Sequence, residues 1–219
     1  MKKIILFNNK FFLFLGLFIF SFLINQYYGN IGVFPVDSFS HFDTGYRILL
    51  NEHPVKDYWI VSGPFLDYFQ ALFFYLFGVN WQIYILHASI INAILSVITY
   101  VVLRNFKLNP IYSFIYSIFF SLLAYPSSGT PFVDHHSAFF SLIGIYFLIL
   151  AIKTDIIYYW ILLPIVFTFA FLSKQVPATY IIISAIIILF FYSTFFKKFK
   201  WILYSFLSFV FTILIILIF

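Results

Sequence analysis

The chain has 219 residues, of which 64% are hydrophobic and 9% are charged, and its mean hydropathy is +1.05. Globular domains are about 45–50% apolar and about 25% charged, so this composition indicates an integral membrane protein and excludes a soluble globular domain. The net charge is +5, but the basic residues stand at the ends of apolar runs, which argues against a nucleic-acid partner and is typical of membrane-topology signals.

The apolar runs are close to 20 residues long and do not alternate with a period of two, which indicates helices. The expected fold is all-α, a polytopic transmembrane helix bundle of about seven spans with external juxtamembrane helices in the first loop. No repeat or linker divides the chain, so residues 1–219 are expected to form a single transmembrane module. The expected spans are residues 11–28, 83–103, 110–125, 137–152, 156–172, 178–196 and 201–219.

The first apolar run follows three lysines, Lys2, Lys3 and Lys10, and has the appearance of either a signal peptide or a signal anchor. Phe and Leu continue to Tyr28 without a small-residue cleavage site, which favours an uncleaved anchor. The N-terminus is therefore expected in the cytoplasm, and the loop after the first span on the external face.

Five of the seven carboxylates of the chain lie in that loop, between Asp37 and Asp67. Charge is costly to place in a chain of this kind, so its concentration marks the place where the chemistry is expected. Besides the five carboxylates Asp37, Asp43, Glu52, Asp57 and Asp67, this stretch carries Arg47, Lys56, His41 and His53.

The segment 65–77 is apolar but has only about 13 residues, fewer than the ~17 needed to cross a bilayer. If it crossed, the basic residues after the later spans would lie outside; if it lies on the surface, they share the cytoplasm with the N-terminus. We therefore expect an interfacial helix with its apolar face in the outer leaflet. Its polar face, with Asp67 and Gln70 three residues apart, is expected to point toward water.

Between Val36 and Gly78 the chain reads VDSFSHFDTGYRILLNEHPVKDYWIVSGPFLDYFQALFFYLFG. This stretch resembles the C-type (GT-C) integral-membrane glycosyltransferases, particularly the branch similar to dolichyl-phosphate-mannose protein mannosyltransferases and bacterial lipid A aminoarabinose transferases. The resemblance extends to the order of the parts: an acidic external loop, two juxtamembrane helices, a span ending in Arg104, and a second external loop with Asp134.

The resemblance implies transfer of a sugar from a polyprenyl-phosphate donor to a hydroxyl of a lipid, glycan or protein acceptor. It implies a multi-pass protein of the bacterial inner or plasma membrane, with the active site on the external face. It covers only the N-terminal part of the family's architecture, and the chain ends at Phe219 within apolar sequence, so we expect a C-terminally truncated fragment of a longer protein.

The resemblance also implies two catalytic candidates, Asp37 and Asp134. Asp37 follows the first span, as does the acidic residue of the family, and is expected to be the base that takes the acceptor proton. The alternative is that Asp37, before Ser38, or Asp134 is a helix N-cap. Both carboxylates are expected to approach one external cavity.

Five further residues are candidates for substrate binding. Asp43 stands four residues before Arg47, so a helical ion pair is the alternative to phosphate binding by Arg47. Asp57 near Pro54 either stabilises a turn or binds substrate. Lys174 either extends to the interface or contacts the lipid phosphate. The substrate-binding set is Arg47, Lys56, Asp57, Lys174 and His135.

No metal or other cofactor is expected, although a divalent cation remains an open alternative. Asp37, His41, Asp134 and His135 offer the oxygen and imidazole groups for such an ion. The adjacent His135 and His136 cannot both face one point on a helix, however, and the absence of cysteine excludes thiolate ligands. His87, inside the second span, is expected to be a hydrogen-bonded interhelical residue.

Two other classes of protein stay open at this stage. A lipid or solute transporter would place ionisable groups near the membrane midplane, whereas the spans of this chain are almost free of carboxylates. A non-catalytic assembly or remnant protein is the other alternative, and it would fit the abrupt end at Phe219.

Overall fold

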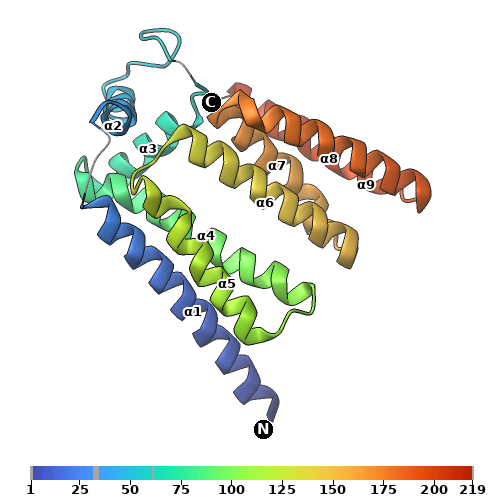
Figure 1. Ribbon diagram of the computed structural model, residues 1–219. Coiled ribbons are helices and arrows are strands. Elements are labelled where there is room, and N and C mark those ends of the chain that lie inside the picture. Colours follow the sequence, from blue (N-terminus) through green and yellow to red (C-terminus); the bar gives the residue numbers. More distant parts are fainter. Residues whose placement is uncertain (1, 32–34, 61, 219) are drawn as a thin grey trace. The chain divides into compact units, whose positions relative to one another are not determined.

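The computed structural model describes residues 2–31, 35–60 and 62–218, although the side chains of residues 2–10, 35–38 and 218 lie outside that description (Figure 1). Within these ranges the chain forms α-helices and one short 3-10 helix and no strand, with a single isolated bridge between Pro54 and Tyr58. The expected all-α class is confirmed.

The chain folds as two compact units, which we describe separately. The first unit comprises residues 1–58 and 67–132, and the second comprises residues 59–66 and 133–219. The expectation of a single transmembrane module stays a prediction.

Each of the seven expected spans forms a helix. Five helices are long and apolar enough to cross a membrane: Phe11–Gly29, Trp81–Asn105, Val133–Thr154, Gln175–Phe195 and Lys200–Leu217. The other two, α5 (Pro110–Leu123) and α7 (Ile157–Ser173), have 14 and 17 residues. The described chain is thus an integral membrane protein, roughly in agreement with about seven spans.

In the first unit α1 (Lys2–Gly29), α4 (Trp81–Asn105) and α5 run side by side (Figure 1). Small polar residues fill their interfaces. The Asn92 amide donates to the backbone carbonyls of Ser21 and Ser121, each at 3.0 Å, and the Ser96 hydroxyl donates to the Ser117 carbonyl at 2.9 Å. Hydrophobic driving force between helices is weak in lipid, so close approach and interhelical hydrogen bonds hold this bundle together.

A glycine contact closes one end of this bundle. After η1 (Tyr125–Ser127) the backbone of Gly129 adopts φ +71° and touches Gly29 so closely that a Cβ on Gly129 would lie 2.5 Å from the Gly29 Cα. The Asn25 amide donates to the Gly129 carbonyl at 3.1 Å. Only glycine fits here, since a side chain would meet both a strained φ and backbone atoms.

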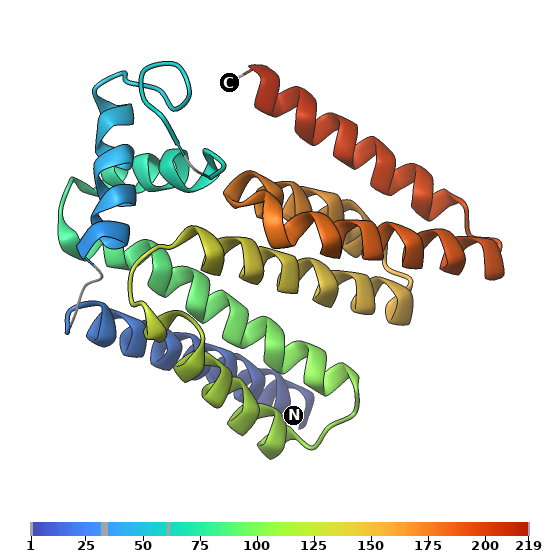
Figure 2. The ribbon, with the colours of Figure 1, turned by 45° about the horizontal axis from the view of Figure 1, so that its top comes forward.

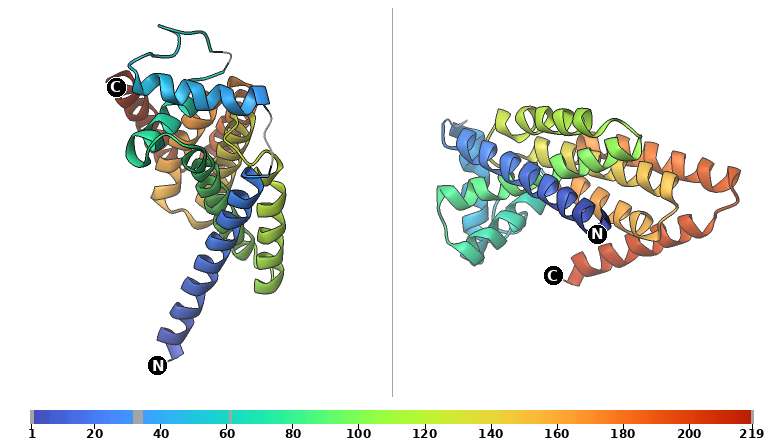
Figure 3. Two further views of the ribbon diagram at one scale, coloured as in Figure 1. Left: turned by 90° about the vertical axis from the view of Figure 1, so that its left-hand side faces the viewer. Right: turned by 90° about the horizontal axis from the view of Figure 1, so that it is seen from below.

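Two shorter helices complete the first unit. α2 (Pro35–Leu49) runs across the end of α1 at which Gly29 lies (Figure 3, left). α3 (Phe65–Phe77) has the bounds and 13-residue length expected of the interfacial helix. Phe42 of α2 packs on Phe74 of α3 and Tyr84 of α4, with ring centroids 5.0 and 5.4 Å apart.

The expected orientation of the polar face of α3 is wrong. Asp67 is 3% exposed and Gln70 is fully buried, and hydrogen bonds with His41 of α2 and His87 of α4 offset the cost of burying these two side chains. The predicted interhelical hydrogen bond of His87 is confirmed, with 2.8 Å between its Nδ1 and the Gln70 Oε1. The exposed stripe of α3 is mainly apolar and consists of Tyr68, Leu72, Tyr75, Leu76 and Phe77.

The second unit consists mainly of α6 (Val133–Thr154), α7, α8 (Gln175–Phe195) and α9 (Lys200–Ile218) (Figure 2). Its core centres on Trp160, whose ring stacks on Trp201 and Tyr192 at centroid distances of 5.6 and 5.7 Å. At Gly144 the ring of Phe167 approaches so closely that a Cβ would lie 2.3 Å from it, so α6 and α7 meet there.

One end of the second unit is closed by an ion pair between two turns. The carboxylate of Asp155, between α6 and α7, accepts hydrogen bonds from the Lys198 ammonium and the Trp201 indole, both at 2.8 Å. The hydrogen bond from Lys198 lowers the pKa of Asp155, and the same bond raises the pKa of Lys198. The α6–α7 and α8–α9 turns therefore share one end of this unit, and Lys153, Lys197, Lys198 and Lys200 lie in or next to these turns.

Candidate active site

A buried carboxylate links the two short helices of the first unit. Asp67 Oδ1 lies 3.1 Å from His41 Nδ1 and 2.5 Å from Thr44 Oγ1, with the Asp67 side chain 4% and the His41 side chain 12% exposed. The Tyr58 hydroxyl donates to the Thr44 carbonyl at 3.4 Å. The Thr44 hydroxyl donates to Asp67 Oδ1, and His41 Nδ1 lies within hydrogen-bond distance of the same oxygen.

Arg47 lies one turn further along α2 and joins three groups. Its Nε donates to Asp43 at 2.7 Å, its Nη1 donates to Glu52 at 3.2 Å, and its guanidinium lies 5.6 Å from the centroid of the Tyr58 ring. The expected Asp43–Arg47 ion pair is confirmed, and hydrogen bonding to Asp43 raises the pKa of Arg47. Binding of a substrate phosphate by Arg47 stays a prediction.

The loop between α2 and α3 contains a tight turn at residues 53–58. Asp57 Oδ2 accepts from the His53 backbone N–H at 2.8 Å, and Lys56 Nζ lies 4.0 Å from the same oxygen. This geometry supports the turn-stabilising interpretation of Asp57, while substrate binding by Lys56 and Asp57 stays a prediction. Burial, and then the charge of Asp67, raise the pKa of both Tyr58 and Tyr68.

Asp37 belongs to the first turn of α2, which begins at Pro35. Asp37 thus lies inside the helix rather than at the N-cap position, and the N-terminal end of a helix favours a carboxylate there. Its side chain lies outside the described residues, and its role as the base stays a prediction.

In the second unit a second ion pair brings two of the candidates together. Lys174 Nζ lies 2.6 Å from Asp134 Oδ1, in the first turn of α6, and the Ser137 hydroxyl donates to the Lys174 carbonyl at 2.9 Å. The Gly63 N–H donates to the Ser173 carbonyl at 3.1 Å, so the chain before α3 is fastened beside this pair. This ion pair places Asp134 and Lys174 at the same end of the second unit, and their roles in catalysis and substrate binding stay predictions.

The histidines after Asp134 face aromatic rings. His135 stacks on Phe139 with ring centroids 5.5 Å apart, while His136 is fully buried and lies 5.8 Å from the Phe140 ring. Nowhere in residues 2–31, 35–60 and 62–218 does a group of three or more His, Cys, Asp or Glu side chains form that could hold a metal ion. Substrate binding by His135 stays a prediction.

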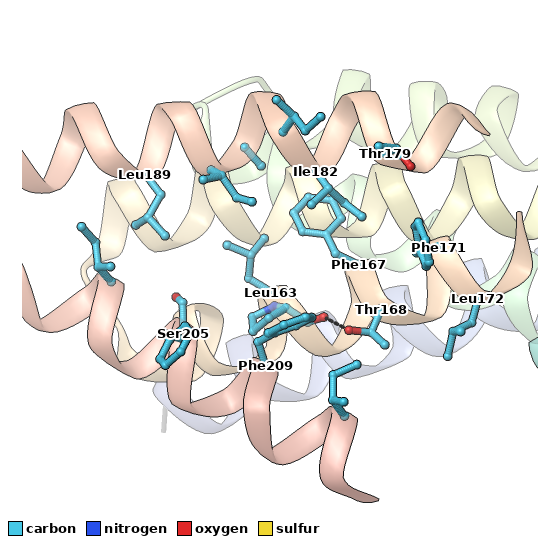
Figure 4. Close-up of a pocket in the computed structure, with 17 residues that line it drawn as sticks. Leu163, Phe167, Thr168, Phe171, Leu172, Thr179, Ile182, Leu189, Ser205 and Phe209 are labelled. Atoms are coloured by element: carbon cyan, nitrogen blue, oxygen red, sulfur yellow. Dashed lines mark hydrogen bonds between the residues drawn. The ribbon is translucent and has the colours of Figure 1, made fainter. Parts of the chain in front are cut away.

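An apolar groove of about 530 Å³ lies between α7, α8 and α9 (Figure 4). Its hydroxyl groups bond to backbone carbonyls: Thr168 to Pro164, Thr179 to Gln175 and Ser205 to Trp160. The groove therefore presents hydrocarbon. Its lining residues are Leu163, Pro164, Phe167, Thr168, Phe171, Leu172, Thr179, Ile182, Ile183, Ala185, Ile186, Leu189, Ile202, Ser205, Phe206, Phe209 and Ile213.

Two of the residues that line the groove are close to Lys174 in the sequence. Leu172 and Thr179, which line it, stand two residues before and five residues after Lys174. The second unit thus contains both a cation paired with a carboxylate and an apolar groove. Such a combination fits an amphipathic ligand with an anionic head and a long apolar tail.

These features define a polytopic helical membrane protein with a charged loop between α2 and α3 and an apolar groove between helices. The chain belongs to the dolichyl-phosphate-mannose-protein mannosyltransferase family, whose family model matches residues 53–218. Membership of this family indicates a membrane glycosyltransferase of the GT-C type, in agreement with the resemblance seen in the first loop. The comparisons with curated proteins and with solved structures give no match.

The family match includes most of the candidate residues. Lys56, Asp57, Asp134, His135 and Lys174 lie inside the matched range, whereas Asp37 and Arg47 precede it. The buried Asp67, which sequence reasoning did not select, also lies inside the match. Its signal was present in the sequence, because a carboxylate and an amide on one face of an otherwise apolar helix are costly without partners.

Proposed function

We propose that the protein transfers a sugar from a polyprenyl-phosphate donor to an acceptor hydroxyl on the external face of the membrane. The observation that carries this proposal is the family match over residues 53–218, and the apolar groove and the Asp134–Lys174 pair of the second unit support it. A donor that is already a lipid needs a hydrocarbon-lined site for its chain and a cation for its phosphate.

The polyprenyl chain lies in the groove between α7, α8 and α9. Hydrocarbon is the natural occupant, because the hydroxyl groups of the wall are bonded to backbone carbonyls. Lys174 contacts the donor phosphate. Its ammonium has three N–H donors, of which Asp134 accepts one, so Asp134 orients the lysine and leaves donors for the phosphate.

The reaction forms one bond and breaks one. The acceptor oxygen attacks the anomeric carbon, the bond from that carbon to the phosphate oxygen breaks with inversion, and polyprenyl phosphate leaves. A carboxylate takes the acceptor proton as the new bond forms, which accelerates the reaction by about 10²- to 10⁴-fold. Asp37 is this base in our proposal, and cations at the departing phosphate stabilise its charge.

The donor assay tests this function directly. Membranes that contain the protein are incubated with polyprenyl phosphate carrying a labelled sugar, or with the same sugar on a nucleotide, and label is followed into lipid, glycan and protein fractions. We expect transfer from the polyprenyl phosphate only, and none with membranes lacking the protein. Transfer from the nucleotide sugar would refute the donor class, and no transfer from either would favour a non-catalytic assembly protein.

A further inference from the structure

Asp67 is buried in the first unit without a place in the proposed reaction. A carboxylate with a 4% exposed side chain on an apolar helix is costly unless it is hydrogen bonded. Its partners are not neighbours on α3 but two residues of α2, His41 and Thr44. These residues are three apart, so they lie on one face of α2, and both contact Asp67 Oδ1.

The other contacts between α2 and its neighbours are less directional. Figure 2 shows α2 crossing α3, and Phe42 fills the contact with Phe74 and Tyr84. At Gly45 a Cβ would lie 2.9 Å from Gln70 Cγ, so the helices approach closely. Apolar packing is non-directional, and only hydrogen bonds with defined donors specify how far α2 is turned about its axis and moved along it.

We propose that Asp67 is a positioning residue which, through His41 and Thr44, holds α2 in the register that the sugar transfer requires. α2 carries Asp37 in its first turn, four residues before His41 on the same continuous helix. A rotation or shift of α2 therefore moves the backbone of Asp37 with it. This inference rests on the proposed function in so far as Asp37 is the base.

The consequence for rate follows from the precision that group transfer needs. A displacement of a reacting group by about 1 Å costs on the order of 10²-fold. Replacing Asp67 by Leu keeps the approximate volume but removes the acceptor. We expect turnover to fall by roughly 10- to 100-fold with the KM for the polyprenyl donor changed by less than about 3-fold, because the donor groove lies on other helices.

Conservative and matched variants separate positioning from loss of folding. Asp67→Asn keeps an acceptor oxygen for His41 and Thr44 and should stay within about 3-fold of wild-type turnover. Tyr75→Leu changes the same helix at a side chain that is 78% exposed, and should have no effect. If Asp67→Asn falls as far as Asp67→Leu, the charge and not the position of α2 matters, and the proposal is overturned.

A double-mutant cycle tests the route of the effect. If Asp67 acts through α2, Asp67→Leu added to the double variant His41→Phe, Thr44→Val should lower turnover no further. Independent, multiplying losses would overturn the proposal.

A spectroscopic readout holds even if the proposed reaction is wrong. The chain has no natural cysteine, so nitroxide labels at Phe39→Cys and Leu72→Cys, 49% and 48% exposed, report the α2–α3 distance alone. We expect one narrow distance distribution in the wild type, in Asp67→Asn and in Tyr75→Leu, and a broadened or shifted one in Asp67→Leu. An unchanged distribution in Asp67→Leu refutes the positioning role, whereas failure of the sugar assay with this shift present refutes only the proposed function.

Discussion

At the scale of single residues, Asp37 is the base in the proposed reaction. Asp37→Asn keeps the size and much of the hydrogen bonding of the side chain but removes its capacity to accept a proton. We expect turnover to fall by roughly 10²-fold or more with donor binding little changed. The measurement is single-turnover transfer together with donor affinity, and a variant that transfers sugar at the wild-type rate would show that Asp37 has only a helix-end role.

Lys174 should affect a different kinetic constant. Lys174→Met keeps the aliphatic stem but removes the cation that contacts the phosphate in our proposal. A charge-assisted hydrogen bond contributes about 1.5–3 kcal/mol, so the KM for the polyprenyl donor should rise by roughly 10- to 100-fold. Lys153→Met, at the other end of the second unit, is the matched control. An unchanged KM in Lys174→Met would leave the Asp134–Lys174 pair as a purely structural bond.

The Asp155–Lys198 pair predicts a dependence of stability on pH. Its hydrogen bond lowers the pKa of Asp155 below the ordinary value of 3.8, so the native state binds the proton less readily than the unfolded chain. The stabilisation is present above about pH 4 and is lost as pH falls through the lowered pKa. Thermal unfolding in detergent should show this acid loss, and Asp155→Asn should lack that component. Identical pH profiles for the two proteins would contradict the assignment.

At the scale of helices, the groove can be filled without touching the charged pair. Ile183 of α8 lines the groove and is 50% exposed, while Ile187 of the same helix is also 50% exposed and does not line it. We expect Ile183→Trp to raise the KM for the polyprenyl donor by about 10-fold or more, since a bulky ring displaces the chain. Ile187→Trp should match the wild type. Equal effects of the two variants would argue that the polyprenyl chain binds elsewhere.

Helices of this chain could be predicted from apolar runs alone, because lipid requires each spanning segment to satisfy its own backbone. The bounds of α3 were likewise predictable from its apolar run. The direction of its polar face was not predictable. Periodicity shows that Asp67 and Gln70 share a face, but not that His41 and His87 of neighbouring helices form hydrogen bonds with them.

At the candidate site, too, a contact between residues far apart in the sequence could not be predicted. Lys174 has no acidic neighbour along the chain, yet it bonds to Asp134, 40 positions away. Charge type and loop position were enough to select both residues. Their contact depends on the packing of α6 against α7 and α8, which a single sequence does not specify.

At the scale of the whole molecule, the distribution of basic residues sets the orientation in the membrane. If α3 lies at the surface, the N-terminal lysines, Arg104, Lys153 and the lysines 197–200 all lie on the cytoplasmic side, and the first loop is external. If α3 crosses the bilayer, the basic residues after α4 change sides. The second unit agrees with helices that cross the membrane in alternating directions. Asp155 and Lys198 join the α6–α7 and α8–α9 turns, whereas Asp134 and Lys174 join the start of α6 and the α7–α8 turn.

The topology can be decided with two single cysteines in a chain that has none. Ser62 precedes α3, and Phe196, which is 64% exposed, follows α8. We expect an impermeant thiol reagent applied from outside to label Ser62→Cys only, and to label Phe196→Cys only after the membrane is opened. Ser193, which is fully buried, serves as the unlabelled control when changed to Cys. Labelling of Ser62→Cys and Phe196→Cys from the same side would mean that an even number of segments separates them, which requires α3 to cross the membrane. Arg104, Lys153, Lys197 and Lys200 would then all lie outside, and only the N-terminal lysines would follow the rule that basic residues lie on the cytoplasmic side.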